Sequence, residues 1–213
     1  TDHAAAVTAT DGVTRTYPFD GRYLQAGDPI RVTVAGEGYD ITRMNAAPLT
    51  GRVNDDGTAI GMTPVADDIE ILDTYGEATA AVVYPERLAG VTLSGDMVRW
   101  YGLNERGEVA WLILDDVTGD LHQYGVLTSV SEVSGANPTG GFLMNAAYVY
   151  DVGGTTRAHT STTTLWNLHT GPCQVKSDGL TLDRIYNLTE VELTGVDGNV
   201  ALSGNRRYTL SES

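Results

Sequence analysis

The sequence predicts an all-β protein made of tandem small β-barrel modules joined by short turns, with little helix. Nearly every apolar segment is short and alternates with polar residues at a period of two, which is typical of half-buried strands. The composition suits strands and tight turns, with 25 Gly and 11 Tyr against 2 Phe. Similar segments also recur along the 213 residues, and this recurrence indicates repeated modules rather than one undivided domain.

The first hairpin is predicted from residues 30–34 and 39–42, which both alternate. A two-residue turn at Gly36-Glu37 pairs Val34 with Tyr39 and Val32 with Ile41. Glycine at the first central position is typical of a type II′ turn, because that position needs a positive φ.

A second hairpin is predicted from residues 97–101, a turn at 104–107 and residues 109–114. Pairing Leu103 with Glu108 places Trp100 opposite Trp111 and predicts that these two indoles are buried together. The residues expected on this inner face are Val98, Trp100, Val109, Trp111 and Ile113. Tyr101 is expected on the opposite, exposed face.

Shorter signals complete the expected secondary structure. Further strands are predicted at 126–130, 146–150, 162–166, 182–186 and 191–193. Turns are predicted at Gly153-Gly154, Asp178-Gly179 and Asp197-Gly198. The one helical candidate is a short helix at 67–72.

The repeats set the expected module boundaries. Glycine precedes a Thr-Gly pair by 23 positions three times: Gly27 before Thr50, Gly95 before Thr118 and Gly171 before Thr194. Residues 80–84 also resemble residues 146–150. We therefore expect a first, incomplete β module at 1–50, β-barrel modules at 51–124 and 125–194, and a final piece at 195–213. That piece either completes the first module or begins a further copy cut from a longer array.

The charge excludes some partners. The chain has 13 basic and 28 acidic residues, a net charge of −15, and such a surface repels nucleic acids and anionic membranes. No apolar run approaches the roughly 18 residues that a membrane span needs. The start, Thr1-Asp2-His3-Ala4, lacks the features of a signal peptide and is interpreted as a trimmed or processed end.

No residue is assigned a catalytic, cofactor-binding or metal-binding role. His159, His169 and Cys173 could supply zinc ligands, but neither they nor His3 and His122 show a known ligand spacing. Acidic runs at 54–57, 67–68 and 115–120 could supply calcium ligands or simply form turns. No feature singles out a pair of carboxylates for glycoside hydrolysis, and no nucleophile elbow or phosphate-binding loop is present. Asn187-Leu188-Thr189 matches a glycosylation sequon, to which we attach no function.

The sequence resembles the repeated β region of surface proteins from gut clostridia that carry S-layer homology domains elsewhere in the chain. The segments that carry the resemblance are residues 90–96, 107–109, 112–120, 124–130 and 183–191. The helical S-layer homology modules themselves are absent from this sequence. The resemblance implies an exported protein at the bacterial cell surface, in which this segment is a spacer or display module, and it implies no site residues.

We therefore expect a non-enzymatic, extracellular structural or spacer module, monomeric as a fragment and without a cofactor. The alternative is a module that binds a carbohydrate or a host protein; a cell-wall polymer or another surface protein is a further possible partner. The aromatic residues that could form a sugar-stacking platform are Trp100, Tyr101, Trp111 and Trp166. Two or more such rings aligned on one open face would favour glycan binding, whereas aromatics confined to cores would favour the spacer. A third class, a hydrolase, needs a deep cleft with a perturbed carboxylate.

Overall fold

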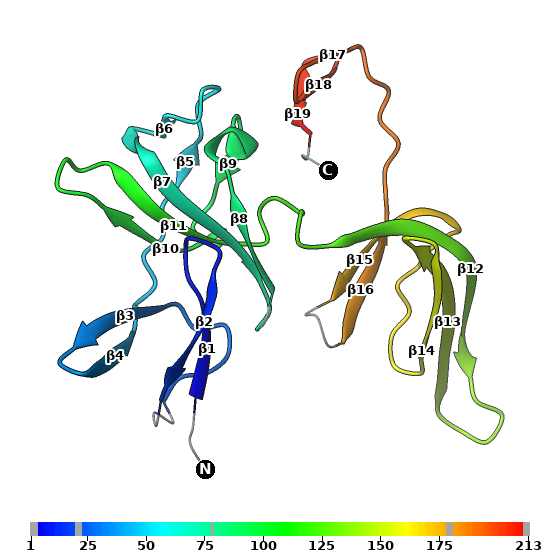
Figure 1. Cartoon of the computed structure of the whole chain (residues 1–213). Coiled ribbons are helices and arrows are strands. Elements are labelled where there is room, and N and C mark those ends of the chain that lie inside the picture. Colours follow the sequence, from blue (N-terminus) through cyan, green and yellow to red (C-terminus); the bar gives the residue numbers. More distant parts are fainter. Residues whose placement is uncertain (1–3, 20–22, 78, 178–180, 211–213) are drawn as a thin grey trace. The chain divides into compact units, whose positions relative to one another are not determined.

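A computed structural model describes residues 4–19, 23–77, 79–177 and 181–210, and these residues form an all-β protein (Figure 1), as predicted. The chain divides into two compact units. Unit 1 comprises residues 1–121 and 192–213, and unit 2 comprises residues 122–191. The described part contains one helical element, the 3-10 helix η1 (Pro85–Leu88).

Unit 1 is built from hairpins around one long strand. Its first strands are β1 (Ala4–Thr8), β2 (Thr14–Pro18), β3 (Ile30–Ala35), β4 (Gly38–Arg43), β5 (Gly51–Arg52), β6 (Ala59–Ile60) and β7 (Thr63–Tyr75). They are followed by β8 (Thr79–Val83), β9 (Thr92–Leu93), β10 (Val98–Leu103), β11 (Val109–Asp115), β17 (Gly195–Asp197), β18 (Val200–Ser203) and β19 (Arg206–Thr209). The long strand is β7, which pairs in parallel with β11 on one edge and in antiparallel fashion with β6 and β8 on the other.

The helix predicted at 67–72 is wrong, because these residues lie inside β7. Ladder hydrogen bonds on both edges of β7 satisfy its backbone, and tertiary pairing of this kind overrides a weak local helical signal. One face of the sheet carries the core of unit 1. The buried core members are Leu49, Val53, Ile60, Ile71, Val83, Leu88, Leu93, Val98, Val109, Leu112 and Leu114.

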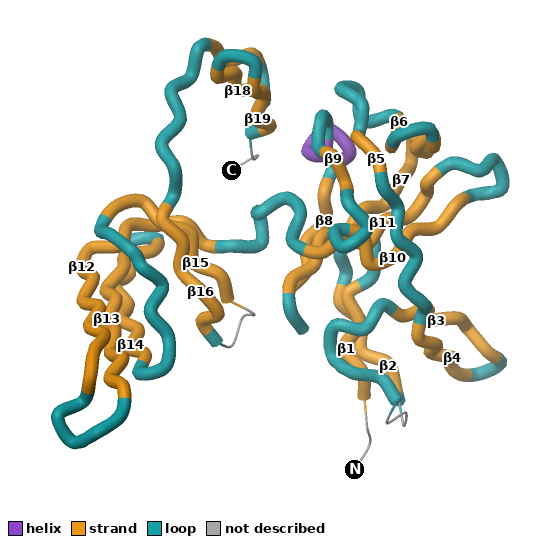
Figure 2. The backbone as a smooth tube through the Cα atoms, turned by 180° about the vertical axis from the view of Figure 1, so that it is seen from behind, coloured by secondary structure: helices purple, strands orange, loops and turns teal. Residues whose placement is uncertain are grey.

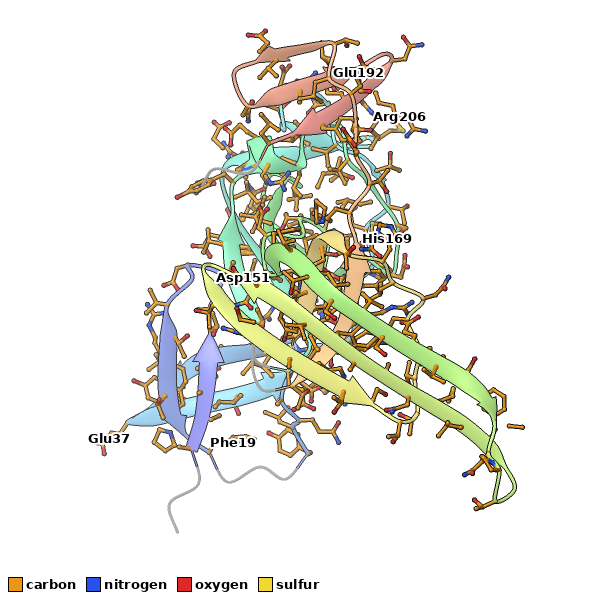
Figure 3. The ribbon with its side chains drawn as sticks, turned by 90° about the vertical axis from the view of Figure 1, so that its right-hand side faces the viewer. Phe19, Glu37, Asp151, His169, Glu192 and Arg206 are labelled. Atoms are coloured by element: carbon orange, nitrogen blue, oxygen red, sulfur yellow. The ribbon has the colours of Figure 1, made fainter. Side chains whose placement is uncertain are left out.

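The predicted β3–β4 hairpin is confirmed in register and in turn type. Val34 pairs with Tyr39 and Val32 with Ile41. Gly36 has φ +59°, whereas Glu37 is not among the described non-glycine residues with positive φ, and this combination matches a type II′ turn. Figure 3 labels Glu37 at the tip of this hairpin. The adjacent β1–β2 hairpin contacts it through Tyr17, whose ring lies edge-on to that of Tyr39 at 4.8 Å.

The predicted register of the β10–β11 hairpin is wrong. Trp100 lies opposite Ile113 and Gly102 opposite Trp111, with shifts in register on either side of this stretch. Two bulges produce the shifts, because Arg99 and Ala110 are the extra residues that have no partner across the ladder.

The bulges also divide the expected inner face in two. Trp100, Trp111 and Ile113 do share a face, but Val98 and Val109 lie on the other one, within the core. Tyr101, expected to be exposed, packs against this core, whereas Trp111 is 41% exposed. Each extra residue reverses the side-chain alternation beyond it, so an apolar residue predicted on one face emerges on the other.

A fully buried carboxylate ties the end of β11 to β7. Asp73 accepts hydrogen bonds from the backbone N–H of Thr74, Val117 and Thr118 and from the Thr118 hydroxyl, at 2.7–3.2 Å. Asp116, with φ +53°, turns the chain so that successive N–H groups face this carboxylate. Thr118 belongs to one of the three repeated Thr-Gly pairs of the sequence, and its backbone N–H and hydroxyl both donate to this buried carboxylate.

The last hairpins of the chain belong to unit 1. Strands β17, β18 and β19 form their own sheet, and β1 pairs only with β2, so the described ends do not pair with each other as one hypothesis proposed. Instead, the Arg87 guanidinium of η1 donates to the Thr209 carbonyl at 3.0 Å and forms an ion pair with Asp120. Arg207 lies 3.5 Å from Asp55.

Unit 2 is a single curled antiparallel sheet that forms half a barrel. Its strands are β12 (Gln123–Ala136), β13 (Phe142–Val152), β14 (Thr155–Ser161), β15 (Gly171–Ser177) and β16 (Leu182–Asn187), in the order β14-β13-β12-β15-β16. A Cβ atom at Gly125 would lie 2.0 Å from the Asp151 carbonyl oxygen, so the close approach of β12 and β13 requires glycine there. The two strands continue past the end of β14 as a ribbon (Figure 3).

A loop at 162–170 covers the inner face of this sheet, whose core members are Leu127, Ala146, Tyr148, Tyr150, Cys173, Val175 and Ile185. The loop runs back along the sheet from β14 to β15 (Figure 2) and packs Leu165, Trp166 and Leu168 against the core. The strand predicted at 162–166 is therefore wrong. The strand predicted at 191–193 is also wrong, because these residues precede β17 without forming a strand. Glu132 explains the first case, because its carboxylate, rather than a neighbouring strand, accepts the backbone N–H groups of Trp166 and Leu168.

The remaining local predictions can be compared directly. Residues 126–130, 146–150 and 182–186 are strands, and turns follow at Gly153-Gly154 and next to Asp197, as expected. The turn predicted at Asp178-Gly179 lies outside the described residues. The predicted module at 125–194 covers nearly the same residues as unit 2, whereas residues 1–50 and 51–124 lie mainly in unit 1. Closed barrels remain a prediction, since each sheet of the described residues has edge strands.

We predict that Asp73→Asn lowers the free energy of unfolding by about 2–4 kcal/mol, because it turns N–H groups of the side chain toward backbone donors that need an acceptor. Urea denaturation followed by tryptophan fluorescence measures the change. The control is Asp68→Asn on the same strand, at an exposed position, which should stay within about 0.5 kcal/mol of the parent protein. Equal midpoints for the two variants would refute the structural role of Asp73.

We predict that Cys173, the single cysteine, reports opening of unit 2. The side chain is fully buried, and burial raises the pKa of its thiol, so little reactive thiolate is exposed. Ellman's reagent should modify native protein at least about 100-fold more slowly than protein in 8 M urea. Comparable rates in the two conditions would show that this core is not formed.

Candidate functional site

Unit 1 contains a cavity of about 1220 Å³ on the face of the sheet that points away from the core. Trp100, Trp111 and Ile113 form one wall, with Leu72 and Thr74 of β7 beside them. The β1–β2 and β3–β4 hairpins supply the opposite wall through Val7, Tyr17, Phe19, Ile30 and Val32. An apolar, aromatic lining with a few polar groups is typical of a ligand site.

The two indoles meet over a glycine. A Cβ atom at Gly102 would lie 2.5 Å from Cη2 of Trp100 and 3.1 Å from Cε3 of Trp111. The missing side chain therefore leaves the space in which both rings lie against the strand. We call Trp100, Gly102 and Trp111 the indole platform.

The β1–β2 turn is held over the sheet at two points. The Thr10 hydroxyl donates to Oε2 of Glu70 on β7. Gly12, with φ +79°, lies so close to β8 that a Cβ atom there would be 2.5 Å from a methyl group of Val82. The turn itself is closed by Arg15 and by the Val13 N–H, whose hydrogen bonds lower the pKa of Asp11 to about 2.

A second attachment holds the segment that precedes β3. Arg99, the extra residue of the first bulge, donates to the Gly27 carbonyl at 2.9 Å and to Asp115 at 2.8 Å. A Cβ atom at Gly27 would lie 3.0 Å from the Gly76 carbonyl, so this segment also approaches the β7–β8 turn closely. The bulge thus positions the indoles and also supplies the side chain that anchors the opposite wall.

Charged groups on the cavity wall are few. Arg31 and Glu77 both line the cavity and have no partner among the described residues, while Asp28 pairs with Arg43. Glu70 lies next to Trp111, because the two residues are directly paired in the parallel β7–β11 ladder. The site therefore combines flat aromatic rings with carboxylate acceptors and with the guanidinium of Arg31, which is unpaired within the described part of the chain.

The sequence predicted no binding residue, and it assigned the two indoles of this platform to a buried core. Their position depends on two bulges that the alternating pattern does not predict. Gly102 was nevertheless a signal of the platform, because it follows Trp100 by two positions within a strand, and glycine inside a strand often marks a close approach.

The residues considered for zinc have other roles. His159 lies on β14, where its ring stacks on Trp166 at 5.3 Å and beside Tyr148. Cys173 is buried in the core of unit 2, and the backbone N–H of His169 donates to the Asn187 side chain. Within residues 4–19, 23–77, 79–177 and 181–210, no group of three or more His, Cys, Asp and Glu side chains could hold a metal ion. Burial and the hydrogen bond to Glu132 both raise the pKa of Tyr148.

The acidic runs considered for calcium lie mostly in turns or pair with arginine. Asn54 closes its turn by accepting the N–H groups of Thr58 and Ala59. Asp55 forms an ion pair with Arg52. The asparagine of the sequon, Asn187, is engaged as well, because its amide also donates to the His169 carbonyl at 2.7 Å.

Comparisons with known proteins find no family, curated sequence or solved structure that matches this chain. Separately, a search of the described residues finds no helix with the length and apolar character needed to cross a bilayer.

We predict that Gly102→Ala disturbs the indole platform without unfolding unit 1. The new methyl group would meet the outer edges of two rings, which can rotate, rather than backbone. The tryptophan emission maximum should shift by several nanometres while the far-ultraviolet circular dichroism stays unchanged. Gly135→Ala is the control, since a Cβ atom there meets nothing within 4 Å. An unchanged emission spectrum for Gly102→Ala would argue against the platform.

Proposed function

We propose that this chain is a non-enzymatic, extracellular module of a larger bacterial surface protein, and that unit 1 binds carbohydrate. The observation that carries the proposal is the indole platform in a cavity of about 1220 Å³. A sugar ring presents an apolar C–H face and a rim of hydroxyl groups, so it needs a flat aromatic surface beside hydrogen-bonding groups. The location outside a bacterial cell rests on the resemblance of the sequence.

Two polar groups that could suggest catalysis have structural roles, which favours a binding module over a hydrolase. Asp73 is fully buried and surrounded by donors from its own corner of the sheet. Glu132 in unit 2 accepts hydrogen bonds from Tyr148 and from the loop at 162–170. Neither carboxylate lines the cavity of unit 1.

A second candidate function is the purely structural spacer expected from the sequence. It is favoured by the organisation of the chain, in which each unit has an apolar core of its own. In this case the cavity would be an incompletely filled interior and would bind no ligand. A protein partner in place of a glycan is a further outcome that a binding screen distinguishes.

Binding to a panel of oligosaccharides, measured by isothermal titration calorimetry, tests the proposal. We predict that Trp111→Ala weakens binding at least about tenfold, because it removes half of the stacking surface. Tyr84→Ala is the matched control, since Tyr84 is 66% exposed and does not line the cavity. If no oligosaccharide binds, carbohydrate recognition is rejected and the spacer remains. If Trp111→Ala binds like the parent protein, the platform is not the site.

A further inference from the structure

We infer that the cavity of unit 1 selects neutral, hydroxyl-rich saccharides over acidic ones, and that Glu70 is the residue that makes this selection. The inference rests on the proposed carbohydrate binding and adds the class of ligand. It is carried by the place of one carboxylate beside an exposed indole and by the balance of charge around the cavity.

Glu70 and Trp111 are direct partners on adjacent parallel strands, so their side chains leave the same face of the sheet about 5 Å apart. Thr10, which lines the cavity, donates its hydroxyl hydrogen to Oε2 of Glu70. The carboxylate therefore stands at the margin of the cavity, next to the indole on which a sugar ring would stack.

The carboxylate of Glu70 can accept further hydrogen bonds. It is half-buried, and among the described residues Thr10 is its single hydrogen-bond donor, which leaves Oε1 without a partner. An ionised carboxylate accepts hydrogen bonds and donates none. A sugar hydroxyl supplies the missing donor, whereas a uronate or sulfate group brings a second acceptor and a like charge.

The charges around the cavity act in the same direction. Arg99 is already paired with Asp115, and Asp28 is paired with Arg43. The remaining charged groups are Arg31 and Glu77, which line the cavity, and Glu70 at its margin, so two carboxylates outnumber one guanidinium. The whole chain carries a net charge of −15, so its field also repels an approaching anion.

The test compares oligosaccharides of equal length on the intact chain. Neutral probes are cellohexaose, xylohexaose and chitohexaose, and the acidic probe is hexagalacturonate. We expect at least one neutral probe to bind about tenfold or more tightly than hexagalacturonate in 20 mM salt. The difference should shrink in 500 mM salt, where exposed charges are screened.

Glu70→Gln identifies the residue responsible. The amide keeps one acceptor oxygen but loses the charge, so we expect weaker binding of the neutral probe, by about threefold to tenfold, and tighter binding of hexagalacturonate. Glu86→Gln, an exposed position on η1 outside the cavity lining, is the control and should change neither affinity. Circular dichroism and the urea midpoint show whether each variant is folded.

The outcomes separate this inference from the proposed function. Equal binding of neutral and acidic probes would overturn the selectivity and leave carbohydrate binding in place. A Glu70→Gln variant that discriminates as well as the parent protein would overturn the role of Glu70. Failure of every probe to bind would overturn the inference and the proposed function together.

Discussion

The strict alternation of side chains along β10 and β11, reversed at two bulges, is the constraint on which unit 1 depends. Because the period is two, each extra residue sends the following side chains to the other face. Arg99 and Ala110 are these extra residues. They place Val98 and Val109 in the core and leave Trp100 and Trp111 on the outer face, where the N-terminal hairpins enclose a cavity instead of a second packed core.

In each unit, a carboxylate accepts hydrogen bonds from backbone N–H groups that are not paired in a β-ladder. Asp73 accepts the N–H groups of the corner that follows β11. Glu132 accepts those of the loop at 162–170, which covers the half-barrel of unit 2. A buried backbone donor needs an acceptor, and in irregular segments a side chain has to provide it. These ties explain why conspicuous acidic residues in this chain need not indicate catalysis.

Features that depend on short-range interactions could be predicted from the sequence, whereas features that depend on contacts between distant residues could not. The β3–β4 hairpin was predictable because a two-residue turn sets its register locally. The parallel pairing of β7 with β11 was not, because the strands are far apart in the sequence and their contact depends on the whole sheet. Residues 162–166 have the composition of a strand, but the distant Glu132 captures the N–H of Trp166 and the segment remains a loop.

The candidate site shows the same limit. The two indoles were predicted to lie together in a buried core, and the rule that exposed rings would favour glycan binding was available in advance. The face of the sheet on which the indoles lie could not be predicted, because the two bulges decide it. The net charge of the chain could be calculated from its composition. The proximity of Glu70 to Trp111 could not be predicted, because it depends on the ladder that joins β7 and β11.

The central claim is that a ligand contacts Trp100 and Trp111 in the cavity of unit 1. The chain has three tryptophans, so a two-dimensional proton–nitrogen spectrum contains three assignable indole N–H signals. Addition of a neutral hexasaccharide should shift the signals of Trp100 and Trp111 in proportion to occupancy and leave Trp166, in the core of unit 2, unchanged. A spectrum in which the Trp166 signal alone moves, or in which no indole signal moves at saturating sugar, would contradict the account.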